Sequence, residues 1–187
     1  QWGIKQVVFT SSSSVYGGCA NNIESCDEHR PPKPRSPYAA SKLSAEVYCA
    51  TWTRLFAVPT TVLRLFNVYG PNQPADDPYS AVIPKFIHDA LHGQPLTIYG
   101  DGEQTRDFTY IDDVVAVILA ALATPVSEPW VGNVGSSDVT SILQLAREIL
   151  DLTATSTIQF LEPRLGDVRH SRANILSAFQ NLAWEPR

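Results

Sequence analysis

The stretch VVFTSSSSVYGG, residues 7–18, opens with a run of β-prone residues and then turns polar. This pattern predicts a buried strand, Val7–Thr10, that leads into a serine-rich loop. Pro37 suits the first turn of a helix, and the pattern behind it predicts that this helix extends to about Phe56. A second β-prone run, TTVLRLF at residues 60–66, predicts the next buried strand. The order strand, helix, strand is typical of a parallel sheet covered by helices, which is an α/β fold.

The half of the chain after Gly70 has a mixed pattern of helices and strands without a repeat or a clear linker. Strands are predicted at 96–99, 131–134 and 157–161, and helices at about 79–91, 114–123, 140–150 and 171–181. Asp112 or Asp113 is expected to cap the second of these helices. Trp52 and Trp184 are expected to pack in the core or between domains.

Composition and charge exclude several classes of protein. With 187 residues, of which 44% are hydrophobic, the chain can bury a core and is neither a disordered chain nor a disulfide-stapled miniprotein. A net charge of −5 argues against nucleic-acid binding, because an acidic chain repels a phosphate backbone. The sequence contains no apolar run of membrane-spanning length and opens with no signal peptide, so a cytoplasmic protein is expected.

Cysteine and methionine usage adds two observations. The three cysteines and four histidines fit neither a disulfide framework nor a zinc-binding spacing, so free thiols and no metal site are expected. The chain begins with Gln1 and contains no methionine. This indicates either a processed N-terminus or a piece of a longer protein.

The candidate catalytic pair is Tyr38 and Lys42, which lie four residues apart on the predicted helix and therefore share one face. An ammonium beside a phenol favours the phenolate, which can remove the proton of a substrate hydroxyl. A serine hydroxyl at the end of the first strand can bind the same oxygen, at the edge where open α/β sheets bind ligands. Alone, the pair would be read as an ordinary surface pair. The serine-rich strand end and the next strand favour a catalytic site.

Five ordered motifs carry a resemblance to a known family. They are TSSSSVYG at 10–17, PYAASK at 37–42, LRLFNVYGP at 63–71, GDGEQTRDF at 100–108 with DDV at 112–114, and PRLGDVR at 163–169. Together they resemble the NAD-dependent epimerase/dehydratase family, the extended branch of the short-chain dehydrogenase/reductases. The resemblance spans nearly the whole chain. The segment PYSAVIPKF at 78–86 is similar to that of UDP-glucose and UDP-N-acetylglucosamine 4-epimerases.

The resemblance implies an architecture and a cofactor. Residues 1–70 are expected to form the C-terminal half of an NAD-binding Rossmann-like domain. Residues 71–187 are expected to form mainly a smaller α+β region that binds a nucleotide-sugar, interleaved with the last elements of the sheet. In such enzymes, bound NAD takes a hydride from the sugar, and in epimerases the hydride returns to the opposite face. A homodimer that pairs through the helix carrying Tyr38 is expected.

Roles for individual residues follow from the same resemblance. Bidentate pairing of guanidinium with phosphate explains the expected use of arginine at the diphosphate. The residues expected at the site are Ser12, Tyr38 and Lys42 for catalysis; Ser11, Tyr38, Lys42 and Phe66 for NAD; and Ser12, Asn67, Arg106, Arg164 and Asp167 for the UDP-sugar.

The residues after Ser12 discriminate among the reactions of this family. Sugar 4,6-dehydratases place an acid–base Asp-Glu pair there, and the sugar-acid decarboxylases place a Glu, whereas this chain has Ser13 and Ser14. A nucleotide-sugar 4-epimerase of the UDP-glucose/UDP-galactose type is therefore favoured. The alternatives are an NAD(P)-dependent nucleotide-sugar reductase or dehydratase of the same family, and a non-catalytic nucleotide-binding module.

The family binds the NAD pyrophosphate with a glycine-rich strand–turn–helix that precedes the serine-rich strand. The sequence contains no such motif, since Gly17-Gly18 does not open a helix. The resemblance also implies a final helix beyond residues 184–187, where this sequence stops. The chain is therefore expected to be truncated at both ends, to bind NAD poorly and to be inactive alone.

Overall fold

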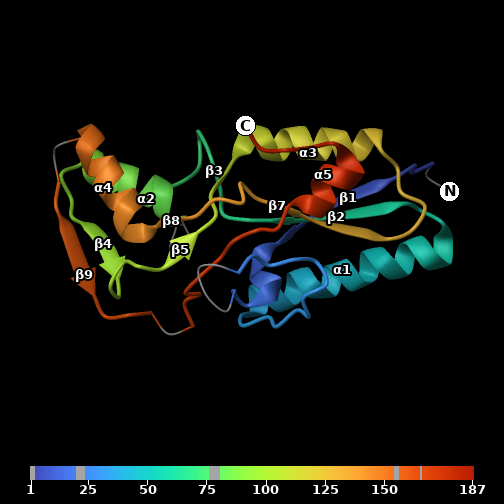
Figure 1. Ribbon diagram of the computed structural model, residues 1–187, viewed down its shortest axis with the longest axis horizontal. Helices are drawn as coiled ribbons and strands as arrows, with labels where there is room; N and C mark the ends of the chain where they lie inside the picture. The colour runs from blue at the N-terminus through green and yellow to red at the C-terminus, as the bar shows by residue number, and fades with distance from the viewer. Residues whose placement is uncertain (1–2, 20–23, 76–80, 154–155, 165) are drawn as a thin grey trace.

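The protein is represented by a computed structural model that describes residues 3–19, 24–75, 81–153, 156–164 and 166–187. Two groups of elements lie side by side along the long axis of the molecule (Figure 1). One group is built on a three-stranded sheet, and the other on two helices and a two-stranded sheet. The predicted α/β class is confirmed.

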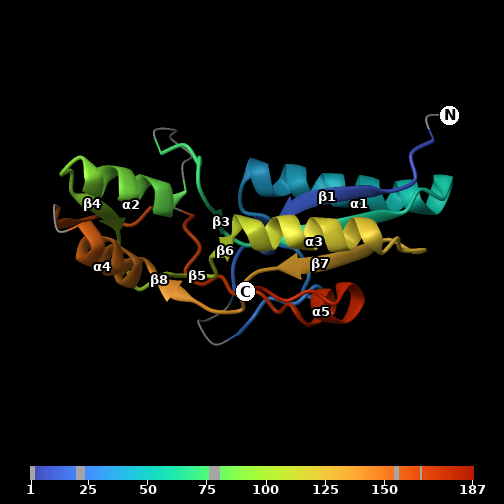
Figure 2. The same cartoon turned by 90° about the horizontal axis from the view of Figure 1, so that it is seen from above.

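The three-stranded sheet consists of β1 (Val7–Ser12), β2 (Thr60–Leu65) and β7 (Trp130–Val134), in the order β1-β2-β7. All neighbours are parallel, with Ser12 opposite Leu65 and Leu65 opposite Val134. The carboxyl ends of the three strands therefore meet at one edge of the sheet. Figures 1 and 2 show that this edge faces the second group of elements.

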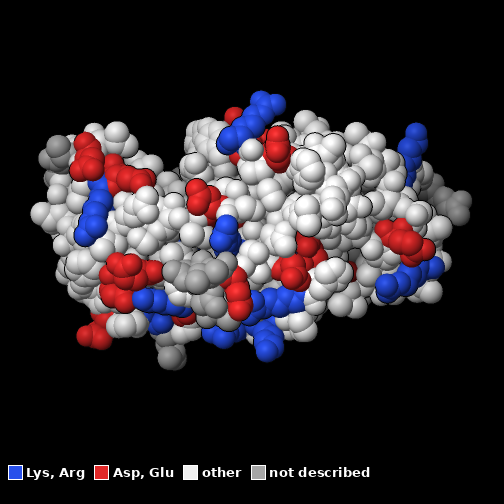
Figure 3. Space-filling view, in the orientation of Figure 1, with Lys and Arg blue, Asp and Glu red and all other residues white. Residues whose placement is uncertain are grey.

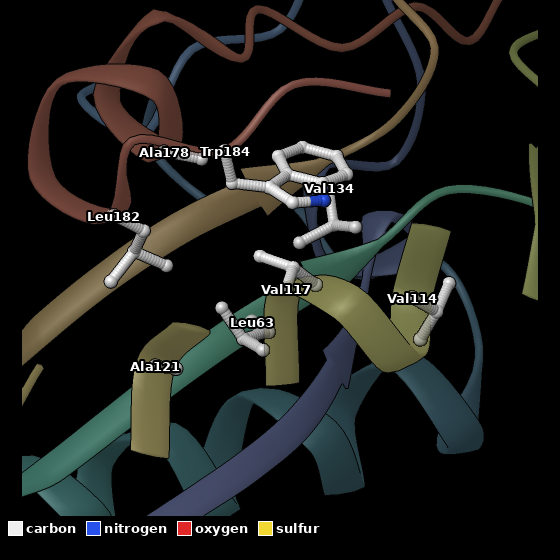
Figure 4. Close-up of a cluster of buried hydrophobic side chains, with 8 residues drawn as sticks. All are labelled: Leu63, Val114, Val117, Ala121, Val134, Ala178, Leu182 and Trp184. Atoms are coloured by element: carbon white, nitrogen blue, oxygen red, sulfur yellow. The ribbon is translucent and has the colours of Figure 1, made fainter. Parts of the chain in front are cut away.

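Helices cover both faces of this sheet. The helix α1 (Pro37–Phe56) lies on one face, and α3 (Ile111–Ala123) and α5 (Leu176–Leu182) lie on the other (Figure 1). Apolar side chains from β2, β7, α3 and α5 form the core of the second face (Figure 4). They are Leu63, Val114, Val117, Ala121, Val134, Ala178, Leu182 and Trp184.

The second group packs α2 (Val82–Leu91) and α4 (Ile142–Thr153) against the parallel pair of β4 (Leu96–Tyr99) and β9 (Ile158–Leu161). A separate apolar cluster, which includes Phe86, fills its interior. Each group therefore has its own core.

Four two-residue strands lie between the larger elements, and one short helix belongs to the first group. The strands pair as β3 with β6 and as β5 with β8, and the helix η1 follows β1 directly. Their bounds are Val68–Tyr69, Thr105–Arg106, Thr109–Tyr110, Thr140–Ser141 and, for η1, Ser13–Tyr16.

Several predicted boundaries are wrong. The strand β1 continues through Ser11 and Ser12, which were predicted to lie in a loop. The helix α3 begins at Ile111, so Asp112 and Asp113 lie in its first turn and do not cap it. The helix predicted from residue 140 begins two residues later, after β8, and that predicted from 79 is described from Val82, with residue 79 itself outside the described residues.

The predicted last helix also begins later. Residues 171–175 are not helical, because Ala173 pairs with Cys26 in a parallel bridge, and α5 starts at Leu176. Of the two tryptophans, Trp184 is buried as expected, but Trp52 is 52% exposed and contacts only the Phe56 ring among the aromatic pairs described. In the part of the chain that is described, no helix is both long and apolar enough to cross a membrane.

Candidate active site

Two adjoining clefts open at the carboxyl edge of the sheet. The first has a volume of about 550 Å³ and is lined by the ends of β1 and β2, the start of α1 and residues 166–171. The second, about 1070 Å³, runs toward α2, β4 and Phe108. Asn67, Arg106 and Asp167 line both clefts, so the two are continuous. All of the predicted site residues except Arg164 line the first cleft, and Arg164 lines the second.

The start of α1 presents Tyr38 and Lys42 to the first cleft. Ser36 caps the helix, because its Oγ accepts the N–H of Ala39 at 3.1 Å, and Pro37 occupies the first turn. The Lys42 ammonium lies 5.8 Å from the centre of the Tyr38 ring and donates to the carbonyl oxygen of Thr10 at 2.9 Å. The helix is thereby tied to β1, and its cation is held beside the phenol.

The end of β1 supplies the serines. Ser12 Oγ accepts the N–H of Ser14 at 3.2 Å, which leaves the Ser12 hydroxyl proton to be donated into the cleft. The Ser11 hydroxyl donates to Glu46 inside the protein. The Ser11 hydroxyl is therefore engaged inside the protein, and the contact of Ser11 with NAD stays a prediction. Ser14 Oγ is buried and has no hydrogen-bond partner in the described part of the chain.

A buried ion pair beneath the site was not found by sequence reasoning. Glu46 lies one turn beyond Lys42 on α1, and Arg64 lies one residue before the end of β2. The Arg64 Nη2 and Glu46 Oε2 atoms are 2.6 Å apart, and both side chains are 6% exposed. Arg64 Nε also donates to Glu46 Oε1 at 3.0 Å, so the pairing is bidentate. The sequence signal for this ion pair was an arginine inside an apolar strand, because a buried charge requires a partner of opposite charge.

The same ion pair extends to Tyr16. Arg64 Nη1 donates to the Tyr16 hydroxyl at 2.8 Å, and that hydroxyl donates to Asn133 Oδ1 at 2.7 Å. Burial raises the pKa of Tyr16 to about 12, so this phenol stays protonated and serves as a donor. The network joins α1, β1, β2 and β7 directly below the first cleft.

The floor and one wall of the first cleft come from the segment after β2. Phe66 is fully buried and borders the cleft, as a residue that lines a planar cofactor ring would. Asn67 has a φ of 24° and donates its side-chain amide to the carbonyl oxygen of Asp107 at 2.9 Å. This bond places Asn67 at the junction of the two clefts.

Asp107, also missed by sequence reasoning, is a buried hub with 0% exposure. Its Oδ1 accepts the N–H of Ser136 at 2.7 Å, and its Oδ2 accepts the N–H of Ala173 at 2.8 Å. A Cβ at Gly135 would lie 2.7 Å from Asp107 Oδ2, so only glycine leaves room there. Burial raises the pKa of the carboxyl. The hub fixes the strand that carries Arg106 to both the end of β7 and residue 173.

Arg106 projects from β5 toward the junction of the clefts. Its Nη2 donates to Asp167 Oδ1 at 2.7 Å, and its Nη1 donates to the carbonyl oxygen of Thr105 at 2.9 Å. The side chain is 14% exposed, and burial lowers the pKa of the guanidinium. The structure therefore brings two predicted ligand residues, Arg106 and Asp167, together as an ion pair.

Arg164 stacks on an aromatic ring in the second cleft. Its guanidinium carbon lies 3.8 Å from the centre of the Tyr99 ring. On the face shown in Figure 3, basic side chains gather among acidic ones along the lower middle edge, over the loops beside the start of α1. Arg106 and Arg164 are the two guanidinium groups among the described residues that line the second cleft.

The arrangement separates two kinds of chemistry. The first cleft combines a hydroxyl, a phenol and an ammonium around a space bordered by Phe66. The second cleft combines aromatic rings with two guanidinium groups. Together they fit a ligand with an oxidisable hydroxyl at one end and a phosphate group further along.

Comparison with known proteins identifies relatives of the whole chain. The model of the NAD dependent epimerase/dehydratase family matches residues 1–135. The protein named uncharacterized UDP-glucose epimerase YtcB, from Bacillus subtilis (strain 168), is 36% identical over 98% of this chain and 56% of its own length. A UDP-N-acetyl-alpha-D-glucosaminuronate decarboxylase of Bacillus cytotoxicus is 40% identical over 83% of this chain and 48% of its own length.

Solved structures show the same similarity. The UDP-glucose 4-epimerase of Thermotoga maritima, crystallised with UDP-glucose, matches 99% of this chain with a TM-score of 0.92 and 34% identity. The UDP-glucuronic acid 4-epimerase of Bacillus cereus, in complex with UDP-glucuronic acid and NAD, matches 96% with a TM-score of 0.86 and 36% identity. This chain covers 59% and 56% of those chains, so it spans little more than half the length of the proteins that it matches.

Proposed function

Because the chain belongs to the NAD dependent epimerase/dehydratase family, we propose that it carries the catalytic and sugar-nucleotide-binding residues of a nucleotide-sugar 4-epimerase. NAD, when bound, supplies the acceptor and donor of a hydride at the sugar carbon. The first cleft fits its nicotinamide end, since Phe66 offers a flat apolar border and Lys42 a cation for ribose hydroxyls. The UDP part of the substrate is proposed to occupy the second cleft.

The chain's own residues perform the proton transfer. Tyr38 accepts the proton of the sugar hydroxyl while the hydride leaves the same carbon. Lys42, held beside the ring by the Thr10 carbonyl, stabilises negative charge on the phenol oxygen. Ser12 donates its hydroxyl proton to the reacting oxygen. Asn67, Arg106, Arg164 and Asp167 orient the nucleotide-sugar.

One observation carries the choice of epimerisation over elimination or decarboxylation. Among the described residues that line the first cleft, Asp167 is the only carboxylate, and it is paired with Arg106 at 2.7 Å. Elimination of water needs a proton donor and an acceptor at neighbouring carbons, and Ser13 and Ser14 supply neither. Epimerisation at one carbon needs only the groups that are present. UDP-glucose and UDP-galactose are the favoured substrates.

A homodimer is proposed from the exposed face of α1. This face carries large apolar side chains, which are Val47, Tyr48, Trp52, Leu55 and Phe56. Such a stripe on a soluble helix is typical of an interface. A Trp52→Glu, Leu55→Glu variant should change a dimer into a monomer in light scattering.

The 187 residues alone are proposed to bind NAD weakly. The sequence contains no glycine-rich fingerprint that follows a strand and opens a helix, and this motif holds the pyrophosphate in dinucleotide-binding folds. Stoichiometric NAD in the purified chain, measured by its absorbance after acid release, would refute this proposal.

The activity is tested in the complete gene product by following UDP-glucose and UDP-galactose with NMR, without added reductant. Interconversion is expected, and Tyr38→Phe should lower kcat by about 10²–10⁴-fold, because the proton acceptor is lost. Tyr110→Phe is the matched control, since Tyr110 is 38% exposed and lines neither cleft.

Each alternative has its own outcome. Turnover only with stoichiometric consumption of a reduced nicotinamide would indicate a nucleotide-sugar reductase. Release of water or carbon dioxide would indicate the dehydratase or decarboxylase reaction. UDP-sugar binding without turnover, unchanged in Tyr38→Phe, would indicate a non-catalytic module.

A further inference from the structure

Two cysteines, Cys19 and Cys26, lie beside the first cleft. Both are hydrogen-bonded to the segment of residues 170–173. The Cys19 N–H donates to the carbonyl oxygen of His170 at 2.8 Å, and the Cys26 N–H donates to that of Arg172 at 2.8 Å. The Cys19 sulfur lies 3.6 Å from the same Arg172 oxygen. One carbonyl group therefore lies against both the side chain of Cys19 and the backbone of Cys26. Both side chains belong to the same apolar cluster.

The two thiols have different surroundings. Cys26 is 1% exposed, whereas Cys19 is partly exposed. The neighbouring Cys26 side chain, whose S–H can stabilise negative charge on the Cys19 sulfur, is the main cause that lowers the pKa of Cys19. Sharing that proton and burial both raise the pKa of Cys26. The guanidinium of Arg30, with Nη1 4.0 Å from the Cys26 sulfur, adds positive charge next to the pair.

These features are those of a reactive thiol with a resolving partner. A thiolate is the nucleophile in thiol–disulfide exchange, and its neighbour's S–H stabilises it. Cys49 offers a contrast within the same chain. It lies on α1, and burial and the nearby Glu46 raise the pKa of its thiol.

We propose that Cys19 and Cys26 form a redox-active dithiol that low-molecular-weight disulfides, such as oxidised glutathione, convert to an intramolecular disulfide. The Cys19 thiolate attacks one sulfur of the oxidant, forms a mixed disulfide and releases one glutathione thiolate. Cys26 gives its proton to solvent, attacks the Cys19 sulfur and releases the second glutathione thiolate. The two protein thiols lose two electrons, and one molecule of oxidised glutathione gains them.

The pair lies at the edge of the candidate active site. Gly18 and Cys26 line the first cleft, and the carbonyl oxygen of Cys26 accepts the Asn133 side-chain amide at 2.8 Å. The bridge would therefore tie two parts of the cleft wall together. The proposal stands on the thiols and does not depend on the proposed function, because its test reads the thiols directly.

The first test incubates the native protein with oxidised glutathione at pH 7, quenches with acid, alkylates the remaining thiols and maps peptides by mass spectrometry. A linked Cys19–Cys26 peptide is expected, with Cys49 alkylated. Cys26→Ser should stop at a glutathione adduct on Cys19, and Cys49→Ser should still form the bridge. Absence of the linked peptide, or a first adduct on Cys49, would overturn the proposal.

The second test measures the rate of Cys19 alkylation by iodoacetamide against pH. The rate should be half-maximal well below the ordinary thiol value of about 8.5, because the Cys26 side chain lowers the pKa of Cys19. Cys26→Ala removes the S–H donor and should move this midpoint toward the ordinary thiol value of about 8.5. A midpoint of about 8.5 in the native protein would contradict the proposed thiolate. Unfolding in urea is the control and should make the three thiols equally reactive.

Discussion

The two groups of elements hold their functional side chains in different ways. In the first group, long elements of a parallel sheet carry Ser12 and Lys42, and a buried ion pair joins the helix to the strand beneath them. In the second group and its connections, Arg106 projects from a two-residue strand and Arg164 rests on the Tyr99 ring. The proposed reacting groups are therefore rigidly placed. The proposed phosphate-binding groups lie on short segments that are easier to alter without unfolding the protein.

The largest effect is expected from breaking the buried pair. Glu46→Ala leaves the Arg64 guanidinium buried without its carboxylate and should lower the free energy of unfolding by about 3–5 kcal/mol. Urea denaturation followed by circular dichroism measures this loss. The double variant Glu46→Met, Arg64→Met should recover most of it, because two apolar side chains then replace the pair. If Glu46→Ala lowers the free energy of unfolding by less than about 1 kcal/mol, the buried ion pair does not hold the first group more rigidly than the second.

A smaller effect is expected at the phosphate-binding end. Arg106→Lys keeps the charge but loses the planar, bidentate geometry, so the KM for UDP-glucose should rise about 10–100-fold with kcat nearly unchanged. Steady-state kinetics of the complete gene product separates the two constants. Lys85→Arg serves as the control, because Lys85 lines the second cleft but is paired with Asp89 at 3.0 Å. A fall in kcat with an unchanged KM would assign Arg106 to the reacting end instead.

The smallest effect concerns a surface pair in the second group. The Arg169 guanidinium holds the pKa of the Asp101 carboxyl at about 2, below its ordinary value of 3.8. The pair stabilises the fold above about pH 4, and the contribution is lost as the pH falls through 2. Arg169→Ala should therefore unfold slightly more easily than the native chain at pH 7 and equally at pH 2. Because both side chains are exposed, 1 M salt should remove the difference at pH 7. A difference that grows on acidification would contradict the pairing.

The first group is also the part that the sequence predicts best. The bounds of α1 match from Pro37 to Phe56, because the capping Ser36 and the proline are local signals. The strand β2 ends one residue from its predicted end, since its apolar run has no competing interpretation. The four-residue spacing of Tyr38 and Lys42 was sufficient to predict that the two residues share one face of this helix.

The rest depends on contacts between distant residues. Two-residue strands such as β5 and β8 have no periodicity of their own. The segment before α5 is extended because Ala173 pairs with Cys26, far away in the sequence. The position of Arg64 in an apolar strand indicated a buried charge. The sequence did not indicate which carboxylate pairs with it. Asp107 accepts backbone N–H groups of Ser136 and Ala173, which no side-chain pattern reveals.

In the proposed epimerisation, the hydride removed from the sugar returns to the same carbon. UDP-glucose that carries deuterium at sugar carbon 4 distinguishes this reaction from the alternatives, with the complete gene product and NMR of the product. We expect UDP-galactose with deuterium retained at carbon 4, and Tyr38→Phe should slow its formation. Deuterium found at carbon 6 of a keto sugar, or lost to a dissociated cofactor, would contradict it.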